Sequence, residues 1–182
     1  YGELRLILSG SQGYVTSSRI WMPFFTGSYW NLKLSRETGS QNLNQSGSDN
    51  NYELIVKSGK FDNHNEYIEY WGSSSIFISG STSSSYNEAW STYTFTSGNN
   101  HLLGYLGGTG SNNTISPDGV TFDGKFNEFR YWITNLSQST FDQHVLNPTS
   151  YTDNDLTSSY YNLVYRLPLG TYDQISGSNG NN

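Results

Sequence analysis

Hydrophobic and polar residues alternate along much of the chain, which is the pattern of β-strands that bury one face. In ELRLILS, residues 3–9, three leucines fall on every second position. In NYELIVKSG, residues 51–59, Tyr52, Leu54 and Val56 again share one face, while Glu53 and Lys57 fall on the opposite face. Both segments are predicted to be half-buried strands.

Nine further segments are candidate strands, separated by turn-forming Gly, Ser and Asn residues. Pro23 lies inside one of them and predicts an edge position or a bulge there, because proline cannot donate a backbone hydrogen bond to a sheet. The segments are residues 20–25, 29–35, 66–71, 74–79, 91–96, 101–107, 119–122, 125–133 and 162–169.

A single helix is predicted at residues 137–147, SQSTFDQHVLN. Ser137 or Ser139 can cap its N-terminus, and Pro148 ends it. Phe141 and Val145, four residues apart, give it one apolar side. About eleven strands and one short helix predict an all-β protein, a two-sheet antiparallel jelly-roll sandwich.

The 182-residue length favours one compact domain. We expect a β-sandwich over residues 1–150, followed by a C-terminal strand and tail over 151–182 that closes the sandwich or starts a following module. The start at Tyr1 and the polar last residues suggest a piece of a longer polypeptide.

The amino-acid composition argues against several classes of function. Charged residues make up only 13% of the chain, the net charge is −6, and no cluster of Lys and Arg occurs. These features argue against nucleic-acid binding and against an anionic membrane surface. No apolar run is long enough to span a membrane, and the absence of Cys removes disulfides and thiolate chemistry.

The segment GKFNEFRYWITNLSQSTF, residues 124–141, resembles the closing signature of laminin G-like domains in the concanavalin A-like jelly-roll superfamily. Six of the matching positions form what we call the structural latch: Glu128, Phe129, Arg130, Tyr131, Leu136 and Ser137. The resemblance implies that Phe129 and Tyr131 face the core. Phe126 and Trp132 match as well, whereas Asn127 and Ile133 depart from the pattern.

The amino-acid sequence as a whole is most similar to laminin G-like segments in large structural proteins of marine tailed phages. This resemblance implies a non-enzymatic virion module, such as part of a fibre, spike or capsid-exposed appendage. Its partners would be other virion proteins or copies of itself, with host-surface glycans as additional ligands. The alternative is a carbohydrate-binding module of an extracellular protein, and a glycoside hydrolase is the third reading.

Catalytic candidates are few. Glu128 lies two residues from Arg130 on one strand, which favours a salt bridge over a reactive carboxylate. Glu66 and Glu69 are three residues apart, so on a regular strand they face opposite ways, whereas a retaining glycosidase needs two carboxylates about 5 Å apart. The three histidines, at positions 64, 101 and 144, lack the spacing of a zinc site. We therefore expect no enzymatic activity.

Two ligand possibilities are kept open. Asp118 and Asp123 could supply oxygen ligands to Ca²⁺. Each is followed by glycine, however, and a turn-forming Asp-Gly pair explains the presence of both residues. No other cofactor is expected. Exposed aromatic rings could stack on sugars beside Asn and Ser side chains. Tyr86 and Trp90, next to a long Ser-rich stretch, are the candidates chosen for that role. A core position is favoured for the other aromatic candidates, which are Trp21, Tyr29, Trp30, Tyr70, Trp71, Tyr93 and Trp132.

Overall fold

The computed structural model describes residues 1–10, 13–38, 49–62, 65–79, 125–155 and 162–168. These residues form antiparallel β-sheets and one short α-helix, which confirms the prediction of a mostly β protein. The predicted strands at 91–96, 101–107 and 119–122 lie outside the described residues.

A three-stranded sheet forms the centre of the described structure. Its strands are β5 (Asn31–Thr38), β6 (Asn50–Asp62) and β7 (Asn65–Ile78), in the order β5-β6-β7. The predicted alternation in β6 is confirmed on one side, where Tyr52, Leu54 and Val56 are all buried.

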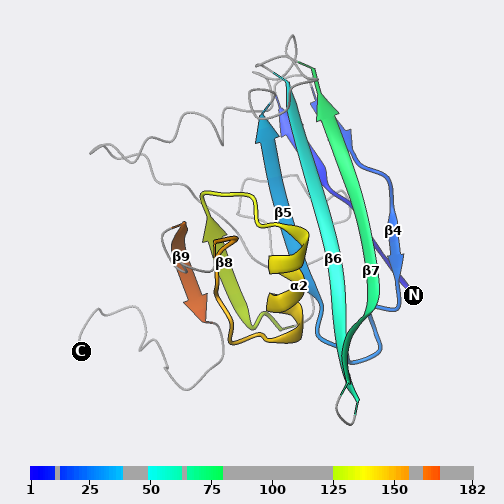
Figure 1. Cartoon of the computed structure of the whole chain (residues 1–182). Helices are drawn as coiled ribbons and strands as arrows, with labels where there is room; N and C mark the ends of the chain where they lie inside the picture. The colour runs from blue at the N-terminus through cyan, green and yellow to red at the C-terminus, as the bar shows by residue number, and fades with distance from the viewer. Residues whose placement is uncertain (11–12, 39–48, 63–64, 80–124, 156–161, 169–182) are drawn as a thin grey trace, which may run out of the picture.

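The N-terminal strands cover that side of the sheet (Figure 1). β1 (Gly2–Leu4) pairs with β4 (Ile20–Met22), and β2 (Ile7–Gly10) pairs with β3 (Gly13–Thr16). Their apolar residues pack in two clusters against β6 and β7. One cluster contains Ile20, Leu54 and Val56, and the other contains Tyr52, Ile76 and Ile78.

Close packing of this layer requires a glycine in β7. A Cβ atom at Gly72 would lie 2.5 Å from the Met22 methyl carbon and 2.8 Å from Ile20 Cγ2. Such distances are shorter than any normal contact between carbon atoms, so only glycine lets β4 approach β7 this closely.

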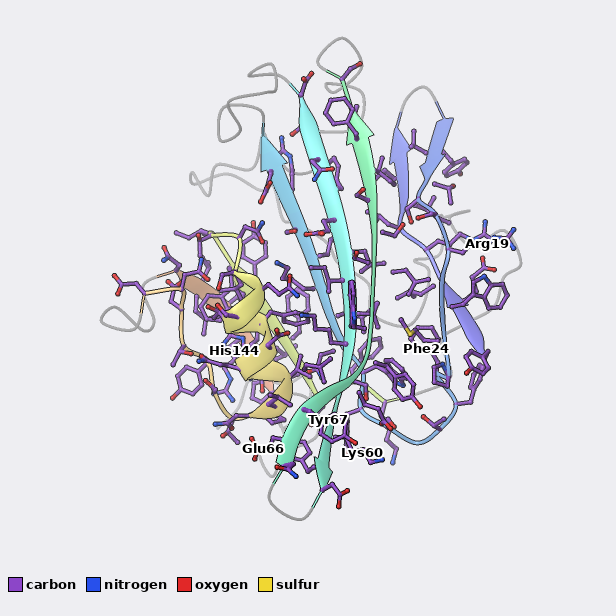
Figure 2. The ribbon with its side chains drawn as sticks, turned by 45° about the vertical axis from the view of Figure 1, so that its right-hand side comes forward. Arg19, Phe24, Lys60, Glu66, Tyr67 and His144 are labelled. Carbon is purple, nitrogen blue, oxygen red and sulfur yellow. The ribbon has the colours of Figure 1, made fainter. Side chains whose placement is uncertain are left out.

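Helix α2 (Gln138–Leu146) covers part of the opposite side of the sheet (Figure 1). Phe141 and Val145 pack on Ile55 of β6, as their spacing predicted. The Ser137 hydroxyl accepts a hydrogen bond from the Thr140 backbone at 3.1 Å, which confirms the predicted N-terminal cap. Figure 2 shows His144 of α2 on one side of the sheet and Phe24 on the other.

The helix changes the expected environment of Lys57. The alternating pattern placed this residue on the polar side of a half-buried strand, but its side chain is almost completely buried beneath α2. Strand β6 is therefore covered on both sides over part of its length, which is a correction to the prediction.

A separate antiparallel pair consists of β8 (Glu128–Trp132) and β9 (Leu163–Pro168). The C-terminal segment 162–168 thus pairs with the strand of the structural latch. Phe129 was expected to face the core, but 39% of its surface is exposed, and its ring lies beside Tyr165 with the ring centroids 6.3 Å apart. Tyr131 is half-buried.

Several strand boundaries differ from the predictions. Residues 66–71 and 74–79 were predicted as two strands, but residues 66–71 and 74–78 belong to the single long strand β7, which ends at Ile78. Residues 3–9 divide into β1 and β2 because Leu6 bonds with Ser17 through both its backbone N–H and its carbonyl, and the chain changes partner there. Strand β4 ends immediately before Pro23, where a ladder hydrogen bond would be lost.

Candidate functional site

The structural latch contains a carboxylate that two arginines hold. Glu128 Oε1 accepts hydrogen bonds from Nε of Arg130 at 2.6 Å and from Nε of Arg166 at 2.5 Å. Arg166 lies on β9 and also contacts Glu128 Oε2 at 3.3 Å. Burial alone would raise the pKa of Glu128, but the two guanidinium groups outweigh burial and lower that pKa to about 2.

The same arginines fix the chain that follows α2. Arg130 donates to the carbonyl oxygens of Pro148 and Ser150, both at 2.6 Å. Arg166 lies over the ring of Tyr151, 4.8 Å from its centroid. Arg130 and Arg166 thereby connect strands β8 and β9 to residues 148–151. The Glu128 carboxylate, which both arginines contact, has a structural role in this connection.

The other latch residues join the start of α2 to the central sheet. Leu136 is buried, and its carbonyl accepts a hydrogen bond from Lys33 Nζ at 2.7 Å. Lys33 also donates to the Asn135 side chain at 3.1 Å, and Asn135 donates to Glu37 at 2.5 Å. Burial lowers the pKa of Lys33, partly opposed by the nearby acids.

An ion pair lies between α2 and β6. Lys57 Nζ donates to Asp142, and the same ammonium lies 5.7 Å from the centroid of the Phe141 ring. The contact of Asp142 with this buried lysine holds the helix on the sheet.

His144 is enclosed by the chain on both sides of α2. Its Nε2 atom lies 2.8 Å from the Thr152 carbonyl oxygen, and its ring stacks on Trp132 of β8 with the centroids 5.7 Å apart. Burial lowers the pKa of His144, opposed by the hydrogen bond with Thr152. This arrangement is that of a core histidine in its neutral form.

The two carboxylates weighed as glycosidase residues have different surroundings. Glu66 is exposed near the β6–β7 hairpin, opposite Phe61 in the register (Figure 2). Glu69 lies at a β-bulge and forms an ion pair with Lys60 at 3.4 Å.

The remaining sequence candidates lie outside the described residues. These are Tyr86 and Trp90, the two aromatic candidates for sugar binding, and Asp118 and Asp123, the two calcium candidates. Within the described parts of the chain, no group of three or more His, Asp or Glu side chains is placed to hold a metal ion.

Several aromatic residues for which a core position was favoured are in fact exposed. Trp71 is 63% exposed, and Trp21 and Tyr29 are also open to solvent. In contrast, Trp30 packs between Phe24 and Tyr70, with ring centroids 4.8 and 5.8 Å away.

Trp71 belongs to an exposed surface on the side of the sheet that α2 partly covers. On β7, Trp71, Ser73, Ser75 and Phe77 alternate with residues that face the N-terminal strands, and all four are exposed. Their partners on β6 include Asn51, opposite Phe77, and Glu53, opposite Ser75. We call these six residues the Trp71 face.

Sequence reasoning did not select the Trp71 face, although its signal is present. In the segment WGSSSIFI, alternate residues point to opposite sides of the strand, with Ile76 and Ile78 on one side and Ser73, Ser75 and Phe77 on the other. An aromatic residue that shares a side with serines, opposite isoleucines, indicates exposure rather than core packing.

Comparisons with family models, curated proteins and solved structures found no match to this chain. In the described residues, no helix combines the length and the apolar character needed to cross a membrane.

Proposed function

We propose that this chain is a non-enzymatic module of a larger virion structural protein, such as a fibre, a spike or a capsid-exposed appendage, and that it also recognises host-surface glycans. The observation that supports a structural role is the engagement of Glu128 by Arg130 and Arg166. A carboxylate that carries two charge-assisted hydrogen bonds and a pKa of about 2 is a poor general acid or base at neutral pH.

The resemblance to laminin G-like segments supports the jelly-roll form of this proposal. In it, the central sheet and the N-terminal strands belong to a concanavalin A-like sandwich, and the pairing of β9 with β8 closes it. An experimental structure of the purified chain tests this arrangement. Two separate β-domains would contradict it.

Purified particles from an infected host test the virion assignment. Mass spectrometry of such particles is expected to detect peptides of this chain in a high-molecular-weight structural protein. An extracellular carbohydrate-binding module is the second candidate, supported by the exposed Trp71. Recovery of the chain in the secreted fraction of uninfected cells, and not in particles, would favour that candidate.

Hydrolysis assays test the non-enzymatic part. The chain is expected to release no reducing ends from β-glucans. Turnover that disappears in Glu128→Gln or Glu66→Gln would overturn the proposal and favour a glycoside hydrolase.

A further inference from the structure

We propose that the Trp71 face binds a linear, neutral oligosaccharide that runs along β7. This inference rests on the glycan-recognition part of the proposed function and names the surface and the ligand class. Two aromatic side chains, two hydroxyl groups, an amide and a carboxylate share this surface, and all of them come from regular strands.

The aromatic residues mark the two ends of the surface. Trp71 is 63% exposed and Phe77 is 54% exposed. They are six residues apart on one strand, which corresponds to about 20 Å at roughly 3.3 Å per residue. A linear saccharide of several rings can therefore contact both, with the apolar faces of its sugars against the aromatic rings.

On β7, the positions between the two aromatic residues are small and polar, whereas on β6 the partners of Trp71 and Ser73, which are Lys57 and Ile55, are buried under α2. Ser73 and Ser75 are exposed on β7 and leave space above the sheet. Glu53 lies opposite Ser75, and Asn51 lies opposite Phe77, in the neighbouring strand. Hydroxyl, amide and carboxylate groups are the partners that sugar hydroxyls require.

Charge selects neutral saccharides over acidic ones. The lysines that the described strands place on this side, Lys33 and Lys57, have their ammonium groups bonded to the α2 region, to the Leu136 carbonyl and Asp142 respectively. The acidic Glu53 side chain is partly exposed on the face itself, and the whole chain carries a net charge of −6. A sialylated or sulfated glycan would meet repulsion there, whereas a neutral one would not.

The packing of β7 on the N-terminal strands makes the Trp71 face rigid. Between Trp71 and Ser73, Gly72 turns toward the N-terminal layer, where Met22 and Ile20 leave no room for a side chain. Ile76 and Ile78 are buried on that same side. Because β7 is fixed by this packing, a saccharide would bind with little ordering of the backbone, which favours affinity.

A glycan array followed by calorimetric titration tests the proposal. Linear neutral oligosaccharides of glucose, galactose and N-acetylglucosamine would be compared with sialylated counterparts of the best neutral ligand. Trp71→Ala is expected to weaken binding by about tenfold or more, and Phe77→Ala by several-fold. Trp21→Ala is the matched control, because Trp21 is 56% exposed on β4, which packs on the other side of the sheet, and it should change affinity less than about twofold.

A charge variant provides a second readout. Glu53→Gln is expected to reduce the preference for neutral over sialylated ligand, since it removes the carboxylate from the face. Circular dichroism and denaturation curves would verify that each variant remains folded.

The outcomes separate this inference from the proposed function. If the wild-type chain binds glycans and Trp71→Ala and Phe77→Ala do not weaken binding, the Trp71 face is wrong while glycan recognition stands. A preference for sialylated ligands overturns the charge argument and with it the inference. If the chain binds no glycan at high valency, both the inference and glycan recognition fail, and the structural role alone is left.

Discussion

The Glu128 network makes a quantitative prediction about stability and pH. Glu128→Gln keeps the size and shape of the side chain but removes the charge that Arg130 and Arg166 contact. A fall in the pKa of Glu128 from 4.5 to about 2 corresponds to roughly 3 kcal/mol, at about 1.36 kcal/mol per pKa unit. The Arg166 side chain is 37% exposed, so solvent screens its interaction with Glu128. We therefore expect Glu128→Gln to lower the free energy of unfolding by about 1–2 kcal/mol at neutral pH.

The pH dependence has a defined sign. Because the folded-state pKa of Glu128 lies below the unfolded value, its stabilisation is fully present above about pH 4.5 and is lost as the pH falls toward about 2. The difference in unfolding free energy between wild type and Glu128→Gln should therefore shrink across this window. High salt should reduce the difference as well.

Urea denaturation at several pH values measures this difference directly. Glu66→Gln is the matched control, because it makes the same chemical change at an exposed carboxylate and should alter stability by less than about 0.5 kcal/mol. The reasoning is refuted if Glu128→Gln is as stable as wild type at neutral pH. It is equally refuted if the difference between the two stays constant down to about pH 3.

Three further predictions concern packing and protonation, each checked by denaturation curves. Leu54→Ala should lower the free energy of unfolding by about 2–5 kcal/mol because Leu54 is only 6% exposed. Leu34, its cross-strand partner, is 42% exposed, so Leu34→Ala should lower it by less than about 1 kcal/mol. Equal losses would contradict the layer arrangement. Gly72→Ala should cost about 1–3 kcal/mol because the added Cβ atom would lie 2.8 Å from Cγ2 of the stiff Ile20 side chain, and an unchanged stability would exclude that contact. His144 has a pKa below the ordinary 6.5, so the wild type should lose stability as the pH falls below about 6.5, and His144→Gln should not show that loss.

Local signals in the sequence predicted the parts of the fold that depend on neighbouring residues. Helix α2 has its cap at Ser137 and stops before Pro148, since capping and termination are decided within a few residues. The alternation in β6 correctly placed Tyr52, Leu54 and Val56 on one side.

Burial was harder to predict, because it depends on what lies above a residue rather than on its own strand. Leu34 and Leu54 are cross-strand partners with the same side-chain orientation, yet only Leu54 lies beneath the N-terminal strands. Lys57 reads as a polar surface residue until α2 brings Asp142 over it. Phe129 fits a core position by its pattern but lies on a two-stranded pair whose outer side is open.

The lengths of α2 and β7 explain why the Trp71 face is exposed. Helix α2 has nine residues and so a length of about 14 Å at roughly 1.5 Å per residue, whereas the fourteen residues of β7 extend over about 46 Å. A helix of this length cannot cover the strand. It packs near Gly59, where a Cβ atom would already lie 3.3 Å from Leu146, and it buries Ile68 at that end of β7. On the sheet, α2 packs on Ile55 and Lys57 of β6 and on Ile68 of β7, and it leaves the Trp71 and Phe77 side chains exposed.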